Sequence, residues 1–166
     1  MTDDDALNLG VLLFVPYREM ERRVLVALTE SGFADLTQAQ ARLVARIGPE
    51  GSRLTDLAAQ AQVTKQTAGV LVDQLVRAGY LAREPDPSDG RARLLRLAEK
   101  GQQAVEVANR AAVEVQAEWV AHLGPRRAAT LRKSLVALRE ITDPYRKSLV
   151  AGPDLPPGQA LRRPPV

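Results

Sequence analysis

The chain has 166 residues and a net charge of +3, which allows one compact domain with a buried core, alone or with added helices. It has no cysteine and one histidine, so a disulfide framework, a zinc finger and a thiol switch within the chain are excluded. Aromatic residues make up only 4%, which disfavours single-strand binding by base stacking. Because the beginning is acidic and no apolar run approaches the roughly 18 residues of a membrane span, we expect a cytoplasmic protein without membrane contact.

The first predicted helix follows an apolar stripe that ends near Ser31. From Leu13, its apolar residues recur in steps of three and four through Tyr17 to Leu28, the pattern of an amphipathic helix. Pro16 lies inside this run. Either the regular helix begins there, with proline at its first position, or a longer helix kinks there.

Two short helices are predicted next, over residues 38–47 and 54–61. The first has Thr37 in position to cap its N-terminus, and a glycine–proline pair follows its end. The second carries a short apolar stripe, and Ser52 or Thr55 is its expected cap. Both helices precede the segment with the clearest functional pattern.

A fourth helix is predicted over residues 64–78, with Thr64 as its cap. Its apolar side carries Ala68, Leu71, Val72 and Leu75, and its polar side carries Lys65, Gln66, Gly69 and Asp73. The first turn presents hydroxyls and amides that meet phosphate oxygens, and lysine and glutamine side chains that reach purine edges. We interpret it as a DNA-recognition helix, although an ordinary capped surface helix has the same local pattern. Its predicted DNA-binding residues are Thr64, Lys65, Gln66 and Thr67.

Two strands, residues 81–84 and 93–97, are predicted to flank a turn over residues 85–90. Helix, turn, helix and hairpin in this order form a winged helix-turn-helix, a fold that binds duplex DNA. The hairpin is the wing of this fold. Its presence behind the fourth helix favours the DNA-recognition interpretation of that helix.

The wing turn carries the second candidate for a DNA contact. Gly90 accepts the positive φ of a tight turn, so the Asp89 carboxylate is expected to brace the Arg91 guanidinium and direct it outward. An extended arginine fits the narrow minor groove, whose potential is strongly negative over A·T runs. We predict that Asp89, Arg91 and Arg93 form the DNA-binding part of the wing, whereas Arg83 is interpreted as a solvated wing residue.

Two further helices are predicted after the wing. Their apolar positions are Val105, Ala108, Ala112, Val115 and Trp119 in the fifth helix, and Ala128, Leu131, Leu135, Leu138 and Ile141 in the sixth. The apolar faces of helices one and six exceed what a small DNA-reading core requires, so we interpret the surplus as a dimer interface. We therefore divide the chain into an N-terminal dimerisation helix (1–34), a winged helix-turn-helix domain (35–100), C-terminal dimerisation helices (101–148) and a disordered proline-rich tail (149–166).

The wing contains the run Asp86-Pro87-Ser88-Asp89-Gly90-Arg91-Ala92-Arg93. This run resembles the wing motif of the multiple-antibiotic-resistance regulator (MarR) family of winged-helix transcription factors. The resemblance extends over residues 7–141. It implies a mainly α homodimer, in which helices one, five and six dimerise and each fourth helix and wing address one half of a palindromic operator. It also implies that small, often aromatic or phenolic, acids bind between the two regions, as in many members.

Three positions depart from the pattern of this family. Gln62 stands where the turn between the third and fourth helices commonly has glycine, so a left-handed backbone there costs on the order of 1 kcal/mol. Ala98 replaces the threonine usual at the start of the fifth helix, which forfeits a cap worth about 1 kcal/mol. Gly90 replaces an arginine that is often found in the wing, so Arg91 or Arg93 must make the minor-groove contact.

Four residues are the candidates for a ligand site. Tyr17 and Arg18 on helix one, with Trp119 and His122 on helix five, offer aromatic walls and cations for a small carboxylate. Core or dimer packing accounts for the two aromatic residues equally well, and a lone histidine on an apolar stripe is commonly a hydrogen-bonded structural residue. Arg18 has the alternative of an ion pair with Glu21 on its own helix.

The predicted function is that of a homodimeric, sequence-specific DNA-binding regulator, a repressor of transcription, with a small aromatic or acidic molecule as the candidate effector. Two alternatives stay open: a winged-helix module that binds a protein partner without DNA, and a DNA-binding regulator without an effector. We expect no enzyme, because the chain has no phosphate-cradling glycine loop and no nucleophile–histidine pair. We also expect no metal and no cofactor.

Overall fold

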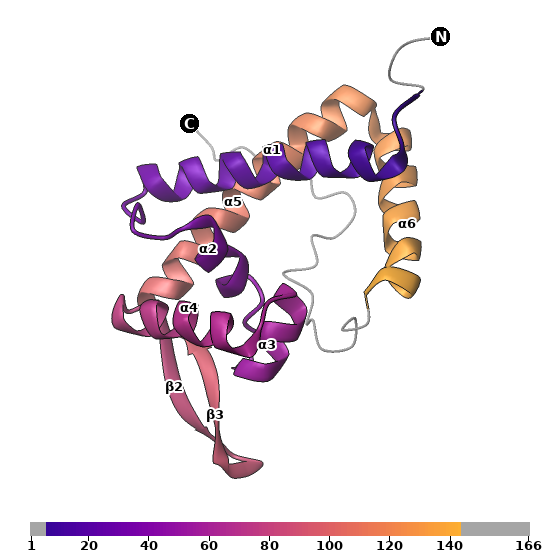
Figure 1. Cartoon of the computed structure of the whole chain (residues 1–166). Helices are drawn as coiled ribbons and strands as arrows, with labels where there is room; N and C mark the ends of the chain where they lie inside the picture. The colour runs from indigo at the N-terminus through magenta and orange to yellow at the C-terminus, as the bar shows by residue number, and fades with distance from the viewer. Residues whose placement is uncertain (1–5, 144–166) are drawn as a thin grey trace.

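Figure 1 shows the computed structural model, which describes residues 6–143. Its elements in chain order are α1 (Leu9–Glu30), α2 (Gln38–Val44), β1 (Ser52–Arg53), α3 (Leu54–Ala61), α4 (Lys65–Arg77), β2 (Leu81–Asp86), β3 (Asp89–Leu97), α5 (Glu99–Leu123) and α6 (Pro125–Thr142). The strands form one antiparallel sheet in the order β1-β3-β2. The mainly α fold with a β-wing is therefore confirmed.

Helix α1 begins earlier than its regular apolar stripe indicates. The Asn8 side chain caps it by accepting a hydrogen bond from the Val11 N–H at 3.1 Å, so the first turn forms at Leu9. Pro16 lies inside the helix, so the longer helix is confirmed and a start at Pro16 is wrong. Proline removes one hydrogen bond from the helix, but residues 9–19 are exposed, and water can bond to the freed carbonyl.

Helix α2 is capped as predicted but is shorter. The Thr37 hydroxyl accepts from the Gln40 N–H at 3.3 Å, while the Gln40 side-chain oxygen accepts from the Thr37 N–H at 2.9 Å. The helix ends at Val44, before the predicted end, because the amides after its C-cap Ala45 bond to carbonyls three residues back. The Arg46 N–H, for example, donates to the Leu43 carbonyl at 3.1 Å.

The prediction that Ser52 or Thr55 caps α3 is wrong. The residue before α3 is Arg53, which makes no side-chain cap hydrogen bond. Ser52 and Arg53 instead form β1, which pairs with β3, and the Ser52 hydroxyl accepts from the Gly48 N–H at 3.0 Å. A strand this short is defined by its partner, which lies far along the chain, and has no local pattern of its own.

The wing is longer and its turn is tighter than predicted. Its two strands β2 and β3 extend as far as a pairing of Asp86 with Asp89, which leaves Pro87 and Ser88 between them. The expected turn over residues 85–90 is therefore too long. A register irregularity accompanies this end of the hairpin, and Figure 1 shows the hairpin projecting away from the helices.

The buried core joins the three helices of the winged-helix region to the base of the wing and to the ends of α1 and α5. Tyr80 is its largest fully buried side chain, with its ring centroid 6.3 Å from that of Phe33. Gly101 lies so close that an added β-carbon would stand 2.1 Å from the Tyr80 carbonyl oxygen. Two expected departures are confirmed, since Gln62 has a left-handed φ of 54° and Ala98 gives α5 no side-chain cap.

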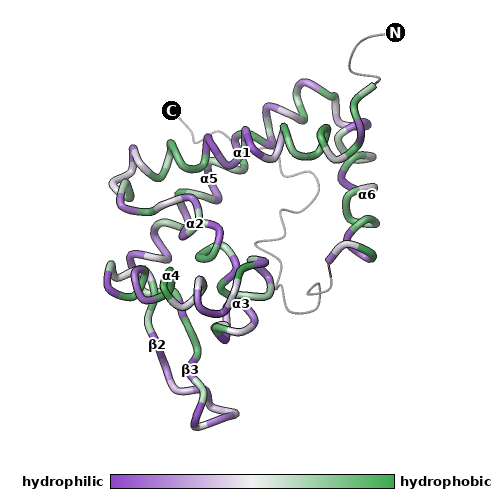
Figure 2. Tube along the Cα trace, in the orientation of Figure 1, coloured by the Kyte–Doolittle hydropathy of each residue, from purple (hydrophilic) through white to green (hydrophobic). Residues whose placement is uncertain are grey.

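The long helices α1 and α5 pack against each other, while α6 stands apart from the winged-helix region (Figure 1). No residue of α6 is buried, and Figure 2 shows hydrophobic residues along both α1 and α6. The large exposed ones are Leu9, Val11, Leu12, Leu13, Phe14, Val15, Tyr17 and Val26 on α1, and Leu131, Leu135, Val136, Leu138 and Ile141 on α6. This surface is the one that the sequence assigns to a dimer interface.

Within residues 6–143, none of the helices combines the length and the apolar character of a membrane span. The disordered tail predicted over residues 149–166 lies outside the described residues.

Candidate nucleic-acid interface

The first turn of α4 presents the predicted recognition residues to solvent. The Thr64 hydroxyl accepts a hydrogen bond from the Thr67 N–H at 3.0 Å and lies 2.8 Å from the Thr67 hydroxyl. The predicted cap is thus confirmed. Lys65 and Gln66 are exposed beside these threonines. The opposite side of the helix is anchored in the core, so these four residues stand on a rigid element.

The wing tip differs from the expected arrangement at Asp89. Its Oδ1 accepts a hydrogen bond from the Arg91 backbone N–H at 3.1 Å, so this carboxylate holds the main chain and not the guanidinium. The predicted Asp89–Arg91 side-chain brace is therefore wrong, and so is the positive φ expected at Gly90, which this glycine does not have. Arg91 and Arg93 are both exposed on β3, and their roles in DNA binding stay predictions.

The carboxylate that organises the wing is Asp86, which the sequence reasoning did not single out. Its Oδ1 accepts from the Ser88 N–H at 2.8 Å and from the Ser88 hydroxyl at 2.6 Å. Its Oδ2 accepts from Arg53 Nε at 2.8 Å and from Arg53 Nη2 at 2.5 Å. The hydrogen bonds from Ser88, followed by those from Arg53, lower the pKa of Asp86 to about 2. Asp86 therefore closes the wing turn and ties it to the start of α3.

Part of this arrangement has a sequence signal. An aspartate followed two residues later by serine is typical of a side-chain-stabilised turn, so Asp86 could have been found from the motif. Arg53 could not, because it lies 33 residues away in the chain and nothing local indicates its partner.

A second cluster joins the winged-helix region to α5. The Tyr80 hydroxyl donates to Asp35 Oδ1 at 2.5 Å, and Lys100 Nζ donates to Asp35 Oδ2 at 2.8 Å. Lys100 also donates to the Ala78 carbonyl at 3.2 Å, and its Nζ lies 4.2 Å from the Tyr80 ring centroid. The hydrogen bonds from Lys100 and then Tyr80 lower the pKa of Asp35. These contacts couple the end of α4 to the first turn of α5.

The four predicted ligand residues show separate local environments. The Tyr17 hydroxyl donates to Glu21 at 2.7 Å, and burial raises the pKa of Tyr17. The Arg18 guanidinium carbon lies 5.6 Å from the Phe14 ring centroid. Trp119 is partly buried and His122 is exposed.

The alternative ion pair between Arg18 and Glu21 is not formed. Glu21 instead accepts hydrogen bonds from Arg42 Nε at 2.5 Å and Gln38 at 2.9 Å. The Arg42 guanidinium lowers the pKa of Glu21 to about 2.

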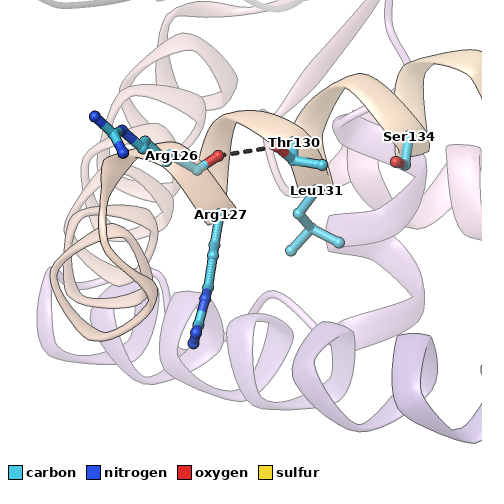
Figure 3. Close-up of a pocket in the computed structure, with 5 residues that line it drawn as sticks. All are labelled: Arg126, Arg127, Thr130, Leu131 and Ser134. Carbon is cyan, nitrogen blue, oxygen red and sulfur yellow. Dashed lines mark hydrogen bonds between the residues drawn. The ribbon is translucent and has the colours of Figure 1, made fainter.

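A hollow of about 450 Å³ lies along α6. Figure 3 shows its lining residues, Arg126, Arg127, Thr130, Leu131 and Ser134. The Thr130 hydroxyl donates to the Arg126 carbonyl at 3.0 Å, a bond within the helix. None of the four predicted ligand residues lines this hollow, and their role in ligand binding stays a prediction.

Residues 34–92, from the loop between α1 and α2 into β3, match the family model described as the MarR family. This winged-helix segment is therefore similar to the MarR family. No curated protein sequence matches the chain.

Solved structures resemble the chain over most of its length, and not only over residues 34–92. Wild-type MarR from E. coli in its apo form is 23% identical, with a TM-score of 0.64 over 80% of this chain and 97% of that chain. CouR from Rhodococcus jostii RHA1, bound to p-coumaroyl-CoA, is 22% identical, with a TM-score of 0.65 over 84% and 94% of the two chains. A mutant of MepR from S. aureus, bound to an oligodeoxyribonucleotide, is 20% identical, with a TM-score of 0.53 over 82% and 99%. These similarities extend the MarR-like fold to the flanking helices.

Proposed function

We propose that the chain is a DNA-binding transcription regulator, a repressor that binds a palindromic operator as a homodimer. The observation that carries the proposal is the pairing of an exposed polar first turn on α4 with an exposed, arginine-bearing wing. The MarR-family match over residues 34–92 supports it. So does the similarity of the fold to MepR, whose solved structure contains an oligodeoxyribonucleotide.

In this proposal, α4 enters the major groove and the wing reaches the adjacent minor groove. Lys65 and Gln66 contact base edges, while the hydroxyls of Thr64 and Thr67 bind phosphate oxygens. Arg91 extends into the minor groove, where the potential is most negative over A·T runs. In a dimer, two such units address half-sites about one helical turn, roughly 10 base pairs, apart.

The second copy of the chain supplies the other unit. The exposed apolar residues of α1 and α6 are left in water by a single copy, and large exposed apolar patches are typical of protein interfaces. Burial of this surface against a second copy holds the two α4 helices at a constant separation. That separation sets the spacing of the operator half-sites.

The proposed effector is a small aromatic or acidic molecule that releases the dimer from DNA. CouR, whose fold is similar, was solved with p-coumaroyl-CoA. In this chain, Tyr17, Arg18, Trp119 and His122 are the residues proposed to bind the effector. Screening aromatic acids for a rise in melting temperature tests this part, because a ligand that binds the folded state stabilises it.

The decisive experiment is selection of DNA from a random duplex pool by the purified full chain, followed by a salt titration of the enriched sequences. An inverted repeat whose affinity falls steeply with salt is the expected result, because phosphate contacts release counterions. A chain that enriches no sequence and binds no duplex at low salt refutes the proposal and favours a module that binds a protein partner.

The wing assignment has its own test. Arg91→Ala should weaken operator binding by about tenfold, whereas Arg22→Ala, which removes the same charge from α1, should have little effect. Equal affinities of wild type and Arg91→Ala at all salt concentrations would remove Arg91 from the interface.

A further inference from the structure

The structure contains a basic hollow between the recognition helix and the wing, and two of its cations, Arg53 and Arg83, are not among the predicted DNA-binding residues. Its volume is about 360 Å³, and it lies where the first turns of α3 and α4 face the wing. Its cationic lining residues are Arg53, Lys65, Arg83 and Arg93, and the rest of its lining is Leu54, Thr55, Val72, Ala92 and Leu95. Cations from four elements, β1, α4, β2 and β3, therefore line one hollow whose other lining residues are mostly apolar.

These cations are only partly neutralised by the protein itself. Arg53 is bonded to Asp86, whose side chain is 5% exposed. The side chains of Lys65 and Arg93 make no hydrogen bond or ion pair with the residues that the structure describes. Arg83 Nη2 is bonded to Asp73 on α4, whose side chain is 56% exposed. The hollow therefore has an excess of positive charge, and one of its arginines is held by a carboxylate that water reaches.

The position of the hollow relates it to the duplex. If α4 lies in the major groove and the wing in the adjacent minor groove, the sugar-phosphate strand between these grooves crosses the surface between α4 and the wing. The hollow lies on that surface. A phosphodiester offers two anionic oxygens, which an arginine fork binds with parallel hydrogen bonds and a lysine binds as a point charge.

We propose that this hollow binds a backbone phosphate of duplex DNA through Arg83 and Arg93. In the free protein, the Arg83 guanidinium forms an ion pair with Asp73. In the complex, this ion pair breaks and Arg83 binds the phosphate. The Asp73 carboxylate thereby weakens the affinity for DNA of any sequence. This assignment rests on the proposed function, and it changes the interpretation of Arg83 from a solvated wing residue to a DNA contact.

A double-mutant cycle with Asp73→Asn and Arg83→Gln tests the assignment on the full chain. The probe is a random-sequence duplex of about three helical turns, because a phosphate contact is independent of sequence. Glu84→Gln is the matched control for Asp73→Asn. It removes the same charge from the residue next to Arg83. The Glu84 side chain points to the other face of the wing, where it pairs with Arg96. Thermal melts check that each variant is folded.

The expected results follow from the release of one ion pair and the loss of one phosphate contact. Arg83→Gln should make the slope of log K against log salt shallower by about 0.9, so that between about 50 and 200 mM salt it loses roughly 3.5-fold less affinity than wild type. Asp73→Asn should bind about two- to fivefold more tightly than wild type. In the Arg83→Gln background it should give no such gain.

Two results would overturn the inference. One is an unchanged salt slope in Arg83→Gln. The other is an equal gain in affinity from Asp73→Asn with or without Arg83, or from Glu84→Gln, since either shows a general effect of net charge. Both presuppose that the wild type binds the duplex with a steep salt dependence. If the wild type does not bind at low salt, the proposed function itself fails, and the two failures are thus distinguishable.

Discussion

Gly101→Ala should destabilise the fold where α5 meets the winged-helix region. The added β-carbon would stand 2.1 Å from the Tyr80 carbonyl oxygen, so α5 must move by about 1.3 Å to reach an ordinary van der Waals separation. The same carbonyl accepts a hydrogen bond from the Ala98 N–H at 3.0 Å, and Lys100 bonds to Asp35 at 2.8 Å beside it. The movement therefore strains contacts that hold two parts of the molecule together.

The magnitude follows from two opposing effects. Overpacking a well-filled region costs about 1–3 kcal/mol, and a contact this short with a main-chain atom belongs at the upper end. Alanine gains up to about 1 kcal/mol over glycine from helix propensity, so the net loss is about 2 kcal/mol. For a chain of this size, that corresponds to a melting temperature lower by roughly 4–8 °C.

Thermal unfolding followed by circular dichroism, at equal protein concentrations, measures this difference. Gly90→Ala is the matched control, because a β-carbon at Gly90 meets no atom within 4 Å and the residue has no positive φ. It should melt within about 1 °C of wild type. A Gly101→Ala variant as stable as this control would refute the close approach of α5 to Tyr80.

Three further predictions concern stability and are read from melts of single variants. Gln62→Gly should raise the melting temperature by roughly 2–4 °C, because it relieves a left-handed φ of 54° worth on the order of 1 kcal/mol; an unchanged or lower value contradicts that strain. Thr64→Ala should lower the melting temperature by a similar amount, because the cap hydrogen bond from the Thr67 N–H is lost. Thr64→Ser keeps a hydroxyl that can accept this hydrogen bond, so its melting temperature should stay close to that of wild type. Glu21 has a pKa lowered to about 2 by Arg42, so its stabilisation is present above its ordinary pKa and is lost as the pH falls from about 5 toward 2. Glu21→Gln should therefore melt lower than wild type at pH 7 and lose less stability on acidification; parallel pH profiles would show that the pair does not stabilise the fold.

At the candidate site, the sequence predicted the features that depend on neighbouring residues better than those that depend on residues far apart in the chain. The cap at Thr64 and the exposed first turn of α4 were predicted, because a cap and an amphipathic stripe involve residues within one or two turns. The partner of Asp89 was assigned wrongly, since a carboxylate in a tight turn bonds as readily to a backbone N–H as to a side chain. The roles of Asp86 and Arg53 depend on the pairing of β1 with β3, which no local pattern indicates.

The sequence by itself determined the order of the helices, the position of the proposed recognition helix and the position of the wing. Helix periodicity, caps and turn residues act over a few positions, so they can be read from a short stretch of chain. Only the tertiary structure decided that α1 passes through Pro16 and that Asp86 organises the wing. It also decided that Arg83 faces a hollow shared with Lys65. These features depend on solvent exposure and on contacts between distant residues, and the physical cause of each appears only when the chain is folded.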